Sequence, residues 1–141
     1  DVSVRWTAQL EPLGKLLDVI EETYAMDTSL FYLTGMSMGG QGAWALAVEY
    51  PKRFAAVVPV CARGLSDPQR VCAIKNVPVW MFHGAKDDRV PIQESETMVE
   101  ALKVCGGNVR YTVYPEADHD AWTATYDSPH LYTWFLEHQR S

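Results

Sequence analysis

The most constraining stretch of the sequence is residues 30–44, which changes character twice. An apolar run over residues 30–33 is typical of a buried strand, and an Ala-rich helical pattern covers residues 40–50. Between them, residues 35–39 read Gly-Met-Ser-Met-Gly and fit the pattern G-x-S-x-G. A serine in this motif, after a strand and before a helix, lies on a tight turn that lifts its hydroxyl above the sheet. The free N–H groups at the start of such a helix can stabilise a developing oxyanion.

The motif alone does not decide between catalysis and packing, because glycines also occur where a helix lies close to a strand. Its strand–turn–helix context favours the catalytic interpretation. A phosphate-binding loop is disfavoured, since the stretch has no Lys followed by Ser or Thr and its glycines do not match G-x-G-x-x-G.

Length and composition limit the possibilities further. The 141 residues predict a single domain over residues 1–141, and 48% hydrophobic with 21% charged residues is ordinary for a globular protein. The net charge of −6 and the lack of any Lys/Arg cluster disfavour nucleic acid and anionic membranes as partners. No apolar run approaches the roughly 20 residues that span a bilayer. No signal peptide is visible, which suggests a cytoplasmic location, with a removed leader as the alternative.

The cysteines and histidines show no ligand pattern. The three cysteines, Cys61, Cys72 and Cys105, are odd in number and form no C-x-x-C pair, which favours reduced thiols. A Cys61–Cys72 bridge across the intervening loop is the alternative. The four histidines have no metal-ligand spacing, so neither a metal nor a cofactor is expected.

Apolar periodicity predicts helices and strands in alternation. A one-sided stripe predicts a helix over residues 10–24, and two further helices should begin at the prolines 91 and 129. Continuous apolar runs are typical of strands that are covered on both faces. They predict strands at residues 54–61, 77–83 and 109–114, with loops at 62–77 and 115–128. This order predicts an α/β fold with a mostly parallel sheet of about four strands flanked by helices.

Polar residues gather at three strand ends. Ser37 follows the first strand, Asp87 and Asp88 follow the third, and His119 follows the fourth. Ligands of open α/β sheets bind at this edge. A histidine can take the proton of a serine hydroxyl near neutral pH, and a carboxylate fixes the histidine tautomer.

Taken together, these motifs resemble the serine α/β-hydrolases. The likeness is greatest to their carboxylesterase and predicted-peptidase branch, which includes phospholipase/carboxylesterase-like and feruloyl- or acetyl-esterase-like enzymes. It covers nearly the whole chain from about Leu10. The motifs that carry it are Gly-Met-Ser-Met-Gly-Gly at 35–40, Tyr-Pro at 50–51, Phe-Ala-Ala at 54–56, His-Gly-Ala-Lys-Asp at 83–87 with Val-Pro at 90–91, and His-Asp-Ala-Trp at 119–122.

The resemblance implies roles for individual residues. Ser37 would be the nucleophile, Asp87 the acid and His119 the base of a catalytic triad. Asp87 is favoured over Asp88 because the family's aspartate lies four residues after the histidine of the His-Gly pair. The N–H of Met38 would be one oxyanion donor. Trp122 would line the acyl pocket, with core packing as the alternative.

The remaining polar residues of these motifs have plainer expected roles. Asp88 is expected in a turn, Asp118 and Asp120 on a solvated loop, and His83 in a structural role. His130 and His138 are expected on helix surfaces.

The chain departs from the family before the elbow strand. Family members carry several strands there, and a His-Gly-rich loop that supplies a second oxyanion N–H, whereas only a short segment precedes Leu30. The fold is therefore expected to be a truncated, minimal α/β-hydrolase fold. An elbow strand without its outer neighbour would expose an unpaired edge, which favours a symmetric homodimer. The segment 2–4 is the alternative cover for that edge.

The expected activity is that of a serine esterase acting on short-chain or aryl esters, with a small-molecule ester as substrate. Two alternatives remain open. One is an inactive truncated hydrolase domain that serves as an assembly or binding module, and the other is a peptidase or acyltransferase with the same triad.

Overall fold

A computed structural model describes residues 5–140 and contains one four-stranded sheet in this part of the chain. The strands are β1 (Tyr32–Met36), β2 (Ala56–Val60), β3 (Val79–Gly84) and β4 (Val109–Tyr114). They lie in the order β1-β2-β3-β4 and all pairs are parallel. The predicted parallel α/β sheet of four strands is confirmed. The segment 2–4, considered as a cover for β1, lies outside the described residues.

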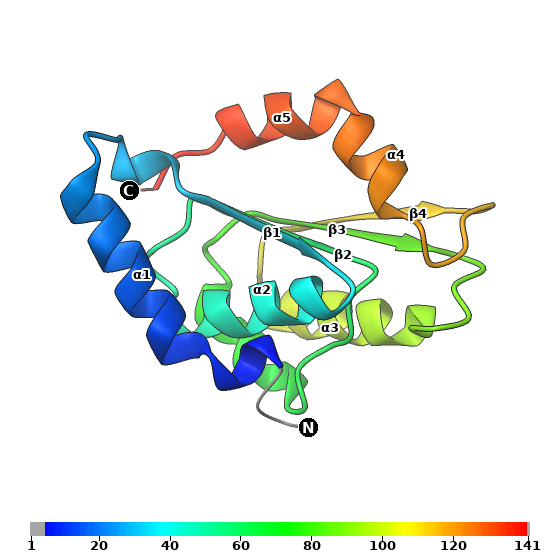
Figure 1. Ribbon diagram of the computed structural model, residues 1–141. Helices are drawn as coiled ribbons and strands as arrows, with labels where there is room; N and C mark the ends of the chain where they lie inside the picture. Colours follow the sequence, from blue (N-terminus) through cyan, green and yellow to red (C-terminus); the bar gives the residue numbers. More distant parts are fainter. Residues whose placement is uncertain (1–4, 141) are drawn as a thin grey trace.

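Helices cover both faces of the sheet (Figure 1). On one side lie α1 (Leu10–Thr23), α2 (Met38–Glu49) and α3 (Ile92–Val104), and on the other lie α4 (Trp122–Asp127) and α5 (Pro129–Leu136). Three short 3-10 helices complete the described elements: η2 (Trp6–Ala8), η3 (Thr28–Leu30) and η4 (Pro68–Ile74). Within residues 5–140, none of the helices has the length and apolar character needed to cross a membrane.

Two apolar clusters lie between these layers because successive strand residues point to opposite faces. Val57 and Met81 face α2 and α3, where they pack in a cluster with Trp44, whereas Val58 and Phe82 pack in the cluster on the α5 side. The central strands β2 and β3 are buried at every position. This double burial explains why their sequences are continuous apolar runs rather than alternating ones.

Two local elements differ from expectation. Helix α4 forms within the segment predicted as a loop, and the Asp120 side chain caps it by accepting hydrogen bonds from the N–H and hydroxyl of Thr123, both at 2.9 Å. The elbow strand begins at Tyr32 rather than Leu30 because η3 takes up residues 28–30. The Asp27 carboxylate stabilises η3 by accepting from the Ser29 N–H at 2.9 Å.

The prediction of three reduced thiols was wrong. Cys72 and Cys105 form a disulfide, and Cys61 is a free, buried cysteine. The alternative Cys61–Cys72 bridge is therefore also wrong. Cys72 lies in η4 and Cys105 at the end of α3, and the packing of η4 on α3 brings their Cα atoms to 5.9 Å despite a sequence separation of 33. Sequence spacing alone carries no sign of this approach.

Candidate active site

Ser37 lies on a strained turn between β1 and α2. Its φ of 52° and ψ of −118° lie in a region of backbone conformation where residues other than glycine are rarely found. The turn is held by two backbone hydrogen bonds, from Ser37 N–H to the Val60 carbonyl at 2.8 Å and from Gln41 N–H to the Ser37 carbonyl at 3.1 Å. A Cβ at Gly35 would collide with the backbone of Gly39, so the close approach requires glycine. Strained turns of this kind hold a side chain in one fixed position.

Ser37, His119 and Asp87 form a hydrogen-bonded line. The Ser37 Oγ and His119 Nε2 atoms are 2.9 Å apart, and His119 Nδ1 lies 2.8 Å from Asp87 Oδ2. The three side chains come from the ends of β1, β4 and β3, which meet at one edge of the sheet. The His119 side chain is 12% exposed and that of Asp87 is 0% exposed. The geometry allows His119 to take the serine proton on one nitrogen while the other donates to the carboxylate.

The Asp87 carboxylate is fixed on both oxygens. Its Oδ1 accepts from the backbone N–H groups of Arg89 and Val90, each at 2.9 Å, while Oδ2 faces His119. Burial alone would raise the pKa of Asp87, but the hydrogen bonds from Val90, His119 and Arg89 outweigh it, and the pKa lies below its ordinary value. The carboxylate is therefore ionised at neutral pH. Asp88, the neighbouring candidate, is exposed.

Gly84 allows the loop that carries His119 to lie against the loop that carries Asp87. A Cβ at Gly84 would collide with the backbone carbonyls of Ala117 and Asp118. Two backbone hydrogen bonds join the loops at this point, from Ala85 N–H to the Tyr114 carbonyl and from Lys86 N–H to the Ala117 carbonyl, both at 2.9 Å. The glycine of the His-Gly pair thus sets the distance between acid and base.

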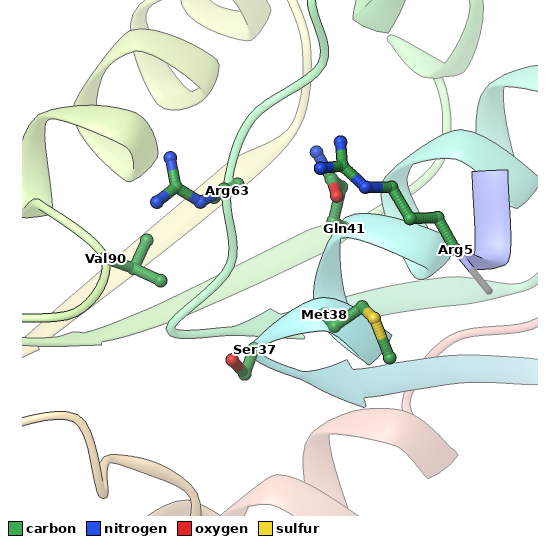
Figure 2. A pocket seen from close by; sticks show the side chains of 6 residues that line it. All are labelled: Arg5, Ser37, Met38, Gln41, Arg63 and Val90. Carbon is green, nitrogen blue, oxygen red and sulfur yellow. The ribbon is translucent and has the colours of Figure 1, made fainter. Parts of the chain in front are cut away.

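A pocket of about 470 Å³ opens beside Ser37 (Figure 2). Figure 2 shows that its wall is contributed by the start of α2, the loop after β2 and the segment before η2. None of the six lining residues is acidic, and two are arginines. Arg63 contacts Glu94 at 3.6 Å, and its side chain is 56% exposed. The lining residues are Arg5, Ser37, Met38, Gln41, Arg63 and Val90.

The other two predicted site residues lie on different sides of this centre. Met38 is the first residue of α2 and lines the pocket, so its N–H belongs to the free donors at the helix start. Trp122 is not among the lining residues. It packs edge-on against the ring of His119 with 5.4 Å between ring centroids, and it supports the cluster on the α5 side. The contacts of Trp122 are thus with the His119 ring and the cluster on the α5 side, and its role in binding an acyl group stays a prediction.

The remaining polar residues also have definite places. Asp118 and Asp120 are exposed, and Asp120 caps α4 as described above. His130 is exposed, whereas His138 is half-buried and its Nδ1 lies 2.7 Å from the Trp134 carbonyl. His83 is fully buried, and its Nε2 lies 3.1 Å from Asp87 Oδ2. The strand pattern predicted the burial of His83 but not its contact with the candidate acid.

Comparisons with known proteins find related sequences and structures. The sequence profile of the dienelactone hydrolase family matches residues 5–132. A carboxymethylenebutenolidase-like protein of Yersinia pestis is 34% identical over 111 residues, which cover 71% of this chain and 40% of that protein. The crystal structure of a thermostable esterase has a TM-score of 0.82 and 35% identity, covering 92% of this chain and 37% of that one.

A dienelactone hydrolase-like protein from Klebsiella pneumoniae, known from its crystal structure, has a TM-score of 0.72 and 25% identity. The match covers 96% of this chain and 60% of the Klebsiella chain. The chain spans about 40% of the length of the curated relatives it matches.

Proposed function

Because this chain belongs to the dienelactone hydrolase family, we propose that it hydrolyses carboxylic esters through a covalent acyl-enzyme. The observation that carries the proposal is the line from Ser37 Oγ to His119 Nε2 at 2.9 Å and from His119 Nδ1 to Asp87 Oδ2 at 2.8 Å. A serine hydroxyl becomes an effective nucleophile when a base in this position removes its proton.

The reaction follows from these contacts in two halves. As Ser37 Oγ attacks the acyl carbon, its proton moves to His119 Nε2, and the ionised Asp87 stabilises the imidazolium. The tetrahedral intermediate then expels the alcohol, which takes the proton from Nε2. In the second half a water molecule loses its proton to the same nitrogen and attacks the acyl carbon. The Ser37 oxygen leaves with that proton, and the carboxylic acid is released.

The oxyanion formed in each half needs donors. We assign one donor to the Met38 N–H, because it lies directly after Ser37 at the start of α2, where the helix dipole also favours negative charge. The loop that carries the second donor in related hydrolases has no counterpart among residues 5–140. Loss of one such donor typically costs about 10²–10³ in rate.

Short-chain or aryl esters fit the pocket beside Ser37, which at about 470 Å³ accommodates a small acyl or aryl group. A more specific candidate is an ester or lactone that carries a carboxylate. The name carboxymethylenebutenolidase denotes hydrolysis of a butenolide, a cyclic ester, with a carboxymethylene group. The arginines Arg5 and Arg63 line the pocket beside Ser37, where their guanidinium groups could bind such a carboxylate.

The first experiment measures turnover of 4-nitrophenyl acetate and butyrate by the protein and by Ser37→Ala. We expect the substitution to lower kcat by several orders of magnitude, because the members of a triad act as a unit. Ser66→Ala, at an exposed serine, is the matched control and should leave kcat unchanged. A fluorophosphonate probe should label Ser37 and no other serine. Retained activity in pure Ser37→Ala protein would show that the assignment is wrong.

The same assay separates the alternative functions. Absence of both turnover and probe labelling would favour the inactive assembly module. Labelling without ester turnover, followed by acyl transfer to an added amine or by cleavage of a peptide, would favour the acyltransferase or the peptidase.

A second experiment tests the carboxylate-bearing substrate. It compares kcat/KM for the mono-4-nitrophenyl ester of glutaric acid with that for 4-nitrophenyl butyrate. Arg63→Gln should lower the ratio of the two values by about tenfold, the lower end of what a charged hydrogen bond contributes. An unchanged ratio would show that Arg63 does not recognise the carboxylate, and a ratio below one in the unsubstituted protein would favour the neutral esters.

A further inference from the structure

His83 is a fully buried histidine at the end of β3 whose ring contacts three polar groups. Its Nδ1 lies 2.5 Å from the Ser95 hydroxyl, and its Nε2 lies 2.9 Å from the Val90 carbonyl and 3.1 Å from Asp87 Oδ2. The Ser95 side chain is itself buried on α3. A buried imidazole facing a buried carboxylate is costly to maintain unless every polar atom is satisfied.

We infer that His83 is a positioning residue for the Asp87–His119 pair: its Nε2–H donates to the Val90 carbonyl, which fixes the loop that holds Asp87, and the same nitrogen packs against Asp87 Oδ2 at 3.1 Å. The inference rests on the proposed function, since it concerns the base and the acid of that reaction. His83 is not among the residues that line the substrate pocket, so it would act through its two neighbours Asp87 and Val90.

The hydrogen-bonding partners of the His83 ring determine which of its nitrogens carries the proton. Nε2 faces a carbonyl and a carboxylate, which only accept, so the proton lies on this nitrogen. Nδ1 then accepts from the Ser95 hydroxyl. The ring is thus held between α3 and the loop that carries Asp87, with its N–H donating to the Val90 carbonyl and lying 3.1 Å from the carboxylate. Among residues 5–140, the titratable groups that face Asp87 are His83, His119 and the buried thiol of Cys61.

Val90 closes the arrangement. Its N–H donates to Asp87 Oδ1 at 2.9 Å while its carbonyl accepts from His83 Nε2. Asp87 therefore has two backbone donors on Oδ1, and its Oδ2 lies 2.8 Å from the His119 ring and 3.1 Å from the His83 ring. A carboxylate held in this way cannot rotate away from His119. Removal of His83 would free one side of Oδ2 and leave the Val90 carbonyl without its donor.

The test is a kinetic comparison of three substitutions, His83→Gln, His83→Asn and His83→Leu, on 4-nitrophenyl butyrate. The amide nitrogen of Gln reaches the place of Nε2, whereas that of Asn reaches only the place of Nδ1. The control is Val79→Ala, at a buried position on the same strand that does not contact Asp87. It removes packing from β3 and should leave kcat and the pH profile unchanged.

We expect His83→Leu and His83→Asn to lower kcat by about 10–100-fold with little change in KM, since a misplacement of about 1 Å at a catalytic group can cost about 10²-fold. His83→Gln should retain most of the activity. In the Leu and Asn variants the acid limb of kcat/KM should also move to lower pH. A carboxylate that has turned away from the base stabilises its protonated form less.

Three results would overturn the inference. These are an unchanged kcat and pH profile in folded His83→Asn, equal activity of the Gln and Asn variants, or an equal loss in Val79→Ala. If His83→Leu does not fold, the Gln and Asn pair decides. The outcome is distinguishable from failure of the proposed function, because that failure would leave the unsubstituted protein without Ser37-dependent turnover.

Discussion

The Cys72–Cys105 disulfide closes a long loop, and its removal is the perturbation whose magnitude follows most directly from the structure. The bridge joins η4 to the end of α3 across a sequence separation of 33. In the chain-entropy description, a cross-link of this span restricts the unfolded chain by roughly 12.5 cal/mol/K, or about 3.7 kcal/mol at 25 °C. The combined substitution Cys72→Ser and Cys105→Ser should therefore lower the free energy of unfolding by about 3–4 kcal/mol.

Urea unfolding followed by tryptophan fluorescence measures this difference. In thermal unfolding it corresponds to a fall in Tm of about 10 °C, since each kcal/mol shifts the Tm of a domain of this size by roughly 2–4 °C. The internal control is the unsubstituted protein in excess reductant. Its urea midpoint and its Tm should equal those of the double variant. Alkylation of the unfolded, unreduced protein should modify only Cys61.

Two results would refute this reasoning. Alkylation of all three cysteines without reductant would mean that the bridge does not form. A bridge that forms but whose removal changes the free energy of unfolding by less than about 0.5 kcal/mol, the range of ordinary surface substitutions, would mean that the unfolded chain is not restricted by it. Disulfides persist in oxidising compartments, so a stable bridge weighs against the cytoplasmic location suggested by the sequence, which stays a prediction.

Three further outcomes are expected. Asp87→Asn should lower kcat by about 10⁴, because it leaves the base in the wrong tautomer, while Asp88→Asn should have little effect; the reverse order would show that the wrong aspartate was assigned. Activity should rise with pH through about 6–7, where a histidine base loses its proton; the lowered pKa of Asp87 keeps that carboxylate ionised throughout, so a flat profile between pH 5 and 8 would exclude His119 as the base. The isolated chain should self-associate as a symmetric dimer through the open edge of β1; a clean monomer at high micromolar concentration in light scattering coupled to size exclusion would contradict this.

The presence and parallel direction of the strands were predictable because a strand buried on both faces has a continuous apolar sequence. Residues 56–60 and 79–84 are buried at every position, and their apolar runs predicted both strands and their parallel pairing. The same topology brings the ends of β1, β3 and β4 to one edge. Ser37, Asp87 and His119 could therefore be expected to meet although the chain separates them widely.

Other features were not predictable because they depend on contacts between distant segments or on weak local signals. The sequence of helix α4 has no periodic pattern of apolar residues. Only the spacing of Asp120 and Thr123, which is typical of a helix cap, indicates a helix there. The disulfide requires the packing of η4 on α3, which no pattern in the sequence specifies. The contact between His83 and Asp87 requires the turn at residues 84–87, since the four-residue spacing alone does not place the two side chains together.

The position of Ser37 beside an edge strand divides the site into two unequal parts. Among the described residues, β1 pairs only with β2, and all hydrogen-bonding partners of the triad come from the β2–β3–β4 side of Ser37. The side chains of Asp87 and His119 are therefore largely enclosed by this part of the chain, at 0% and 12% exposed, and both oxygens of Asp87 are held. At the end of β1, Met36 is exposed, and the pocket beside Ser37 includes Met38 and Arg5 in its lining. Under the proposed function, proton transfer would depend on residues within 37–119, and we expect substrate orientation and the second oxyanion donor to depend on what lies beyond the open edge of β1. Substitutions at Asp87 and His119 should therefore change kcat, and changes in the cover of β1 should change KM and the choice of ester.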